Sequence, residues 1–377
     1  MLKFDELCVE RPLGTSSNNA VLNLLVGCFS ELKYKCIELP IECTVWNPGN
    51  SCIRQDNNIL EIFPGPYSLS LSGNFPVKCL STISELKSLN RFNGILILKD
   101  DLAKETIMPK KYPFYFPDEH KVIYELIEKI QPSGIIAITG KDPSSGMNPF
   151  PLFEDTNMVI PSAFVTNLGT IDYSKEISIT VDSNREMVKS KQLVFRKEGI
   201  EKEIILISAH MDSKYFTNGA LDNASGVYTL YETAKLLDNN KYTIEIVPFN
   251  GEDSPEAAGE LAYLQYVKEN SYSIKAVINI DAPGHIGSET TFSFYNFEET
   301  KKNDLIAENK IKEGIQWYSG DHEMFVFQKI PCIAITSSDL FEDSINLTHT
   351  NKDTSEKIDI NLLKGLSKTI DKIVKKI

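Results

Sequence analysis

Short apolar segments rich in β-branched residues alternate with segments of helical period in the C-terminal half of the chain. This alternation is typical of α/β domains, in which a parallel sheet carries helices on both faces. We therefore expect a mostly parallel central sheet flanked by helices. The predicted strands are 203–210, 242–250, 274–281 and 329–338, and the predicted helices that follow them are 222–237, 254–270 and 355–377.

A region of different texture precedes this half of the chain. Residues 50–172 are rich in proline and are broken into short apolar runs. Two of these runs, GILILKD at 94–100 and GIIAITG at 134–140, have the pattern of buried strands, and residues 120–131 between them have the pattern of a helix. Together they predict a small β/α unit of its own.

The N-terminal segment belongs with the C-terminal half in this interpretation. Residues 15–34 have apolar side chains on one helical face, and Ser16 or Ser17 is available as an N-cap. We therefore expect a discontinuous main domain, formed by 1–49 and 173–377, with an inserted smaller β-rich domain at 50–172.

Composition and charge exclude several classes of function. The chain has 377 residues, 42% of them hydrophobic, and a formal net charge of −13. Such acidity argues against a nucleic-acid surface and against binding to anionic membranes. No apolar run is long enough for a transmembrane helix, and the N-terminal residues lack the features of a signal peptide. The 7 cysteines form no Cys-x-x-Cys pair, so we expect reduced thiols and a cytoplasmic protein.

Acidic residues and histidines follow the predicted strands. His210 and Asp212 follow the first strand, Glu252 and Asp253 the second, and Asp281 the third. The fourth strand leads to a loop that holds His349, and Asp222 stands where the helix after the first strand begins. Ligands of open parallel sheets bind beyond the carboxyl ends of the strands, so these side chains are expected to converge on one edge.

Each of these residues has an ordinary explanation when it is taken alone. An Asp at a helix start is often an N-cap, acids before a helix complement its dipole, and a single His is often a hydrogen-bonded bystander. Taken together, clustered carboxylates would repel each other and would be costly to bury. Two divalent cations would balance the four negative charges of Asp222, Glu252, Asp253 and Asp281. Imidazole with carboxylate ligands suits zinc, although manganese or cobalt would also fit.

The motifs that carry these residues resemble those of the co-catalytic di-zinc aminopeptidases, family twenty-eight of the metallopeptidases. The shared segments occur in the family's order: AHMDS, GALDNASG, NGED, NIDAPG, SGDHEMFVFQKIPCIAIT and LTHTNKDTSEKID. Glutamate carboxypeptidases, glutaminyl cyclases and the transferrin receptor are relatives. By position and pattern, 50–172 resembles the protease-associated domain that is often inserted in this family.

The resemblance implies a role for each residue. Asp222 would bridge two metal ions, and Glu252 would be the general base that takes a proton from a metal-bridging water and passes it to the leaving amine. Asp212 would orient His210 through its second ring nitrogen. The remaining ligands would be His210 and Asp281 for one metal and Asp253 and His349 for the other.

The chain departs from the family pattern at several positions. Asp253 stands where the family commonly has a second Glu, so the metal must lie closer to the backbone. Thr348 replaces a Tyr that stabilises the oxyanion in some relatives. Asp321 and His322 stand where relatives line the substrate pocket, and either a substrate contact or a structural role is consistent with the sequence.

The resemblance predicts a metallo-aminopeptidase that acts on peptide substrates. A glutaminyl-cyclase-type aminoacyltransferase, with one zinc ion, and a non-peptidase amide hydrolase on the same fold are alternatives. A binding protein without catalysis is a third alternative, but it predicts missing ligands, and the ligand set is complete here. No sequence feature specifies the oligomeric state or the preferred side chain of the substrate.

Overall fold

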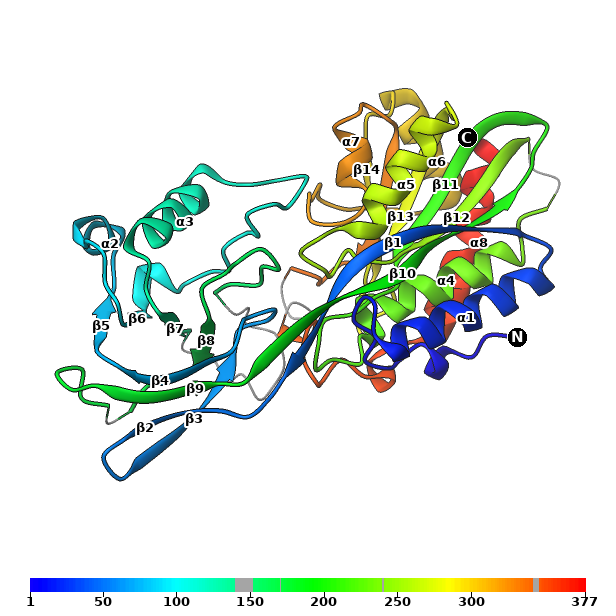
Figure 1. Ribbon diagram of the computed structural model, residues 1–377. Coiled ribbons are helices and arrows are strands. Elements are labelled where there is room, and N and C mark those ends of the chain that lie inside the picture. Colours follow the sequence, from blue (N-terminus) through cyan, green and yellow to red (C-terminus); the bar gives the residue numbers. More distant parts are fainter. Residues whose placement is uncertain (140–151, 170, 239–240, 342–345) are drawn as a thin grey trace. The chain divides into compact units, whose positions relative to one another are not determined.

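The four alternating apolar segments form adjacent strands in the middle of one sheet (Figure 1). They are β11 (Glu201–His210), β12 (Tyr242–Phe249), β13 (Ile274–Ile280) and β16 (Cys332–Ser337), in the order β12-β11-β13-β16. Neighbouring strands in this group are parallel, so Ile207 lies between Ile246 and Ile278. The predicted α/β fold with a parallel central sheet is confirmed.

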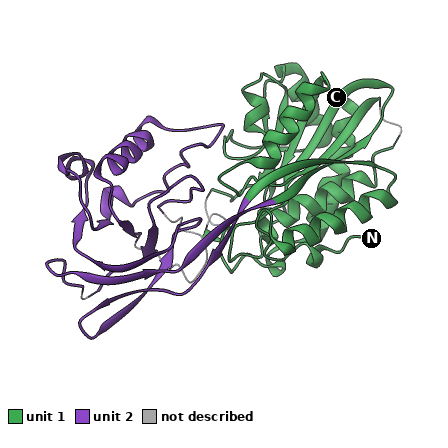
Figure 2. Ribbon diagram, in the orientation of Figure 1, with its two compact units in different colours: residues 1–43, 189–377 green, residues 44–188 purple. Residues whose placement is uncertain are grey.

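The chain divides into two compact units, each with its own sheet (Figure 2). The computed structural model describes residues 1–139, 152–169, 171–238, 241–341 and 346–377. Unit 1 consists of 1–43 with 189–377, and unit 2 of 44–188.

Antiparallel strands flank the parallel centre of unit 1. β10 (Ser183–Lys197) pairs antiparallel with β12, and β1 (Lys35–Pro48) lies beyond it. On the other side, β14 (Thr290–Tyr295) pairs antiparallel with β16 and carries the short β15 (Lys312–Glu313) at the edge. The parallel strands, whose ends carry the candidate site, are therefore internal strands of the sheet.

Helices cover both faces of this sheet. Figure 1 shows α1 (Ser16–Glu31), α4 (Ser225–Ala234) and α8 (Ile360–Lys376) together on one side. Their apolar side chains form one core with alternate residues of the strands, such as Ile244 and Ile246 of β12. On the opposite face, Phe249 of β12 contacts Tyr263 of α5 (Ala258–Glu269). Among the described residues, unit 1 also contains α6 (Glu299–Asn309), α7 (Glu323–Val326), the helical turn Ala220–Ala224 and the short 3₁₀ helices Phe4–Glu6 and Ser355–Lys357.

The N-cap of the first helix lies one residue before the expected position. The sequence offered Ser16 or Ser17, but Thr15 is the N-cap, and its side chain accepts a hydrogen bond from Asn18 N at 3.3 Å. An N-cap residue has extended backbone dihedrals, and Thr15 has them (φ −68°, ψ 165°), whereas Ser16 is already helical.

Unit 2 combines a parallel half-sheet with an antiparallel one. Its strand order is β4-β9-β2-β3-β8-β7-β6-β5, and β5 to β8 are mutually parallel. The helix between β6 and β7 is α3 (Asp118–Ile130), which confirms the predicted β/α unit, although Gly140 lies outside the described residues. The other elements of its described residues are β2 (Ser51–Gln55), β3 (Asn58–Pro64), β4 (Leu71–Phe75), β5 (Val77–Leu80), α2 (Ile83–Ser88), β6 (Ile95–Leu98), the 3₁₀ helix Asp100–Leu102, β7 (Gly134–Ile138), β8 (Ser162–Val165) and β9 (Ile177–Val181).

The unit boundaries differ from the expected domain boundaries at 49/50 and 172/173. β9 begins after residue 172, yet it pairs with β2 and β4 of unit 2. β1 and β10 are long strands of 14 and 15 residues that pass from one unit into the other. A change of composition therefore does not coincide with the change of sheet.

Among the described residues, no helix has the length and apolar character needed to cross a membrane.

A buried ion pair joins β10 to β12 beneath α5. Arg196 is opposite Glu245 in the antiparallel register, and its Nη1 donates to Glu245 Oε1 at 2.6 Å. Glu245 is fully buried and also accepts hydrogen bonds from the hydroxyls of Tyr263 (2.6 Å) and Tyr266 (3.3 Å). The carboxylate thus depends on Arg196 for its only cationic partner among the ion pairs of the described residues.

We predict that Arg196→Met lowers the free energy of unfolding by about 3–5 kcal/mol, because it leaves the charge of Glu245 buried and unpaired. Urea denaturation followed by circular dichroism measures this loss. The control is Glu198→Gln, which removes the exposed partner that Arg196 Nε contacts at 2.7 Å and should cost less than about 1 kcal/mol. Equal losses in the two variants would contradict the assignment.

Candidate metal centre

The carboxyl ends of the parallel strands bring the predicted residues together. His210 is the last residue of β11, and Asp281 directly follows β13. Glu252 and Asp253 lie in the turn after β12, and His349 comes from the loop after β16. Because these strands are parallel neighbours, their ends lie at one edge of the sheet. The convergence expected from the sequence is confirmed.

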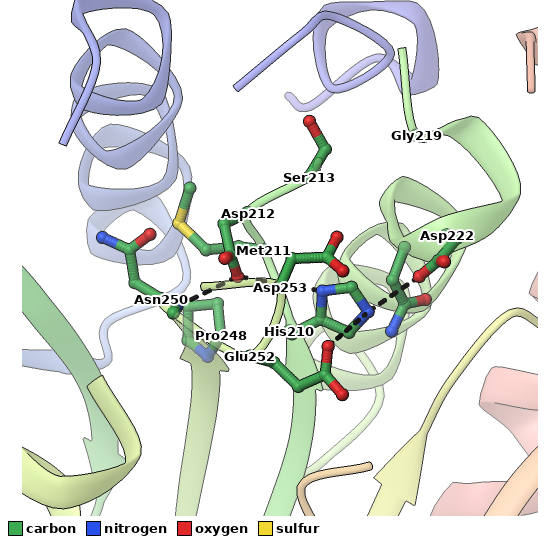
Figure 3. A network of polar contacts seen from close by, with 12 residues as sticks. His210, Met211, Asp212, Ser213, Gly219, Asp222, Pro248, Asn250, Glu252 and Asp253 are labelled. Atoms are coloured by element: carbon green, nitrogen blue, oxygen red, sulfur yellow. Dashed lines mark hydrogen bonds and ion pairs between the residues drawn. The ribbon is translucent and has the colours of Figure 1, made fainter. Parts of the chain in front are cut away.

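Asp222 stands between two histidines. It lies in the short helical turn Ala220–Ala224 that precedes α4, and its own backbone dihedrals are not helical. Asp222 Oδ1 is 2.9 Å from His210 Nε2, and Asp222 Oδ2 is 2.9 Å from His349 Nε2. Figure 3 shows the first of these contacts. The two oxygens of one carboxylate therefore face two different imidazoles.

Two further carboxylates complete two groups that share Asp222. Asp281 Oδ1 lies 3.6 Å from His210 Nε2, and Asp253 Oδ1 lies 3.2 Å from His349 Nε2. The first group is His210, Asp222 and Asp281, and the second is Asp222, Asp253 and His349. Within each group one ligand atom per residue lies within 4.8 Å of the others.

These separations fit metal ligation. Metal–ligand bonds of about 2.0–2.2 Å place neighbouring ligand atoms of a tetrahedral site roughly 3.4 Å apart. Asp253 Oδ2 is also buried without a hydrogen-bond partner among the described residues, although buried carboxylate oxygens are normally satisfied. The imidazole and carboxylate donors of both groups therefore fit a divalent metal ion each.

The pKa shifts of the clustered side chains also indicate a cation site. Burial lowers the pKa of His349, but Asp253 and Asp222 outweigh burial and raise that pKa to about 10. Burial raises the pKa of Asp281, and His210 only partly opposes this effect. The cluster thus holds more negative charge than its surroundings can solvate, and bound cations would offset that charge.

Glu252 lies beside both groups and is less buried than they are. Figure 3 shows its contact with His210, in which Glu252 Oε2 is 3.9 Å from His210 Nε2. The side chain of Glu252 is 24% exposed. Burial raises its pKa well above the ordinary value, His210 opposes the shift, and Asp253 and Asp281 add to it. A partly exposed carboxylate next to the ligands is placed to exchange a proton with a reacting group.

Asp212 faces the second nitrogen of His210 at a distance longer than a hydrogen bond. Its Oδ1 is 3.8 Å from His210 Nδ1 and accepts a hydrogen bond from Gly251 N at 3.0 Å. Asp212 therefore links the residue next to Glu252 to the strand end that carries His210.

Two residues that the sequence did not single out hold the Asp222 turn. Asp353 accepts hydrogen bonds from Leu221 N at 2.6 Å and Asp222 N at 3.1 Å. Arg11 is fully buried, and its guanidinium donates to the carbonyl groups of Met211 (2.5 Å) and Gly219 (2.9 Å). Proximity of Asp353 to His349 in the sequence was an available signal, but nothing near Arg11 indicated its distant partners.

Asp321 and His322 take different positions. His322 is fully buried, donates from Nε2 to the Trp317 carbonyl at 2.9 Å and packs edge-on against the Trp317 ring. Burial lowers its pKa to about 4, so the ring is neutral. His322 is thus a structural residue in this arrangement. Asp321 is also buried, and burial and the charges of Glu260 and Glu252 raise its pKa well above the ordinary value.

Comparisons with solved structures show where this fold occurs. A zinc aminopeptidase from Bacillus subtilis has a TM-score of 0.74 at 16% identity, covering 98% of this chain and 92% of that one. An aminopeptidase from Aneurinibacillus has a TM-score of 0.72 at 16% identity, covering 99% and 93%. A peptidase M28 precursor from Shewanella amazonensis has a TM-score of 0.68 at 18% identity, covering 99% and 90%. No curated protein matches the sequence.

A family model identifies the unit that carries the site. The model of peptidase family M28 matches residues 193–374, which include β11, β12, β13, β16 and every residue of the two ligand groups. Together with the shared fold, this match supports a metal-dependent peptidase. Residues 193–374 of this chain are therefore similar to peptidase family M28.

Proposed function

We propose that this chain is a di-zinc aminopeptidase that hydrolyses N-terminal residues from peptides. The observation that carries the proposal is the position of Asp222, whose two carboxylate oxygens each lie 2.9 Å from a different histidine. His210 and Asp281 would hold one ion, and Asp253 and His349 would hold the other. The similar structures from Aneurinibacillus and Bacillus subtilis are aminopeptidases, the latter a zinc enzyme, and this likeness supports the same activity.

Different residues of the chain have different roles in the proposed hydrolysis. When bound, two divalent ions acidify water, polarise a carbonyl group and offset the clustered carboxylates. Glu252 accepts the proton of the attacking water at a carboxylate oxygen and delivers it to the nitrogen of the leaving amine. Asp212 limits the movement of the turn that carries Glu252 through its hydrogen bond with Gly251. Asp353 holds the amides of Leu221 and Asp222, and Arg11 holds carbonyl groups of the loop that precedes them.

We predict that purified protein removes single N-terminal residues from unblocked peptides and that a chelator stops the reaction. Mass spectrometry of a mixed peptide set, half of it with blocked N-termini and each half with and without chelator, tests this directly. The blocked peptides are the matched control, because they contain the same bonds without a free amino group. The residues released also give the side-chain preference.

Other outcomes of this assay would indicate a different function. Loss of ammonia from peptides with N-terminal Gln would indicate a glutaminyl cyclase, and cleavage of blocked peptides would indicate a different peptidase specificity. No cleavage after addition of zinc, manganese or cobalt would contradict aminopeptidase activity.

We also predict that Glu252→Gln and Asp222→Asn fail in different ways. Glu252→Gln should abolish turnover but keep the bound metal, because it removes a proton acceptor and leaves the two groups that share Asp222 complete. Asp222→Asn should lose metal, because the amide removes the charge shared by both groups. Metal analysis after dialysis, combined with the peptide assay, separates the two effects. Activity that survives in Glu252→Gln, or full metal content in Asp222→Asn, would refute the respective role.

A further inference from the structure

A buried side chain of the first helix pairs with the turn that carries Glu252. Asn18 lies in the first turn of α1, and Asn250 directly follows β12 (Figure 3). Both side chains are fully buried. Asn18 Nδ2 donates to Asn250 Oδ1 at 2.8 Å, and Asn250 Nδ2 donates to Asn18 Oδ1 at 3.2 Å. Each amide therefore donates to the other and accepts from it, although 232 residues separate the two in the sequence.

The remaining donors of this amide pair bind the backbone. A side-chain amide has two N–H donors, and only one from each residue is used within the pair. The second donor of Asn18 binds the carbonyl group of Arg11 at 3.1 Å, and that of Asn250 binds the carbonyl group of Lys191 at 3.1 Å. Loss of either side chain would thus leave buried polar groups without partners, which is costly.

The backbone of Asn250 is held as closely as its side chain. Its amide donates to Gln192 Oε1 at 2.8 Å. Helix α5 approaches from another direction, because a Cβ at Gly259 would lie only 2.6 Å from the carbonyl oxygen of Asn250. The next residue, Gly251, has a φ of 144°, which favours glycine. Glu252 follows at once, so the placement of Asn250 determines where this turn begins.

The same N-terminal segment also holds the loop after β11. Arg11 N donates to Ser213 Oγ at 3.0 Å, and the guanidinium of Arg11 donates to carbonyl groups of that loop. Because Asn18 binds the carbonyl group of Arg11, these contacts belong to one hydrogen-bonded segment. Residues 11–18 therefore join the loop that leads to Asp222 to the turn after β12.

We propose that Asn18 is a positioning residue of the metal centre, which acts through its amide pair with Asn250 on the turn of Glu252 and Asp253. Asn18 contacts neither metal nor substrate in this role. Asp253 belongs to one ligand group and Glu252 is the proposed base, so displacement of their turn should weaken zinc binding and slow hydrolysis. The effect on hydrolysis rests on the proposed function, and zinc affinity is measured without it.

Asn18→Leu tests the proposal, because it keeps a similar volume and removes the amide pair. We expect zinc affinity and kcat/KM to fall by about 10–100-fold, as for other outer partners of metal ligands. Zinc affinity is measured by competition with a chromogenic chelator, at a temperature where circular dichroism shows the folded state. The activity is measured with the peptides that the unchanged protein cleaves. Asn18→Ala, which a helix tolerates well, replaces this variant if Asn18→Leu does not fold.

A double-mutant cycle shows whether the pair acts as one unit. Asn250→Leu should lower zinc affinity as much as Asn18→Leu does. The double variant should lose no more zinc affinity than either single variant, because residues in direct contact are not additive. Losses that add up would show that Asn18 does not act through Asn250, and would overturn the proposal.

Two controls separate positioning from general destabilisation. Asn19→Leu makes the same change at the next residue of α1, whose side chain binds only the nearby Gly14 carbonyl group at 3.4 Å, so zinc affinity should not change. Arg196→Met destabilises the fold away from this turn and should also leave the zinc affinity of the folded protein unchanged. Unchanged zinc affinity in Asn18→Leu, or an equal loss in Arg196→Met, would overturn the proposal. If zinc affinity falls as expected but no peptide is cleaved, the proposed function fails and this inference stands.

Discussion

The rest of the site depends on one carboxylate held between two imidazoles. Asp222 faces His210 with one oxygen and His349 with the other, each at 2.9 Å. Asp281 lies 3.6 Å from His210, and Asp253 lies 3.2 Å from His349. Buried charges of one sign are unfavourable unless opposite charge accompanies them. The cluster is consistent with a site in which cations share Asp222 and the protein supplies the fixed negative charge around them.

The fold holds the backbone of these residues in position. His210 and Asp281 end or follow internal parallel strands whose neighbours fix their register. Asp222 lies in a turn with no strand of its own, and polar contacts hold it instead. Asp353 binds two consecutive amides of this turn, and Arg11 binds carbonyl groups of the preceding loop. β11 and the loop after β16 therefore contact Asp222 directly, and the N-terminal segment holds the loop that precedes it.

The sequence was sufficient for the features that follow from strand order and local pattern. Polar residues after alternating strands predicted one sheet edge, because parallel strands end at the same edge. It was not sufficient for contacts between a side chain and a distant backbone, such as Arg11 with Gly219, which is 208 residues away. Asn18 was also missed, because an Asn near a helix start is ordinarily a capping residue, and only its buried pairing with Asn250 makes it unusual. β9 could not be assigned to unit 2, since its partners β2 and β4 lie more than a hundred residues earlier.

The most direct test of the central claim is X-ray absorption spectroscopy at the zinc edge, with metal analysis of the same zinc-loaded protein. We expect two zinc ions per chain, nitrogen and oxygen ligands only, and a zinc–zinc separation of about 3.5–4 Å. A single zinc ion per chain at saturation, with no zinc–zinc scattering, would contradict a centre in which Asp222 bridges two metals.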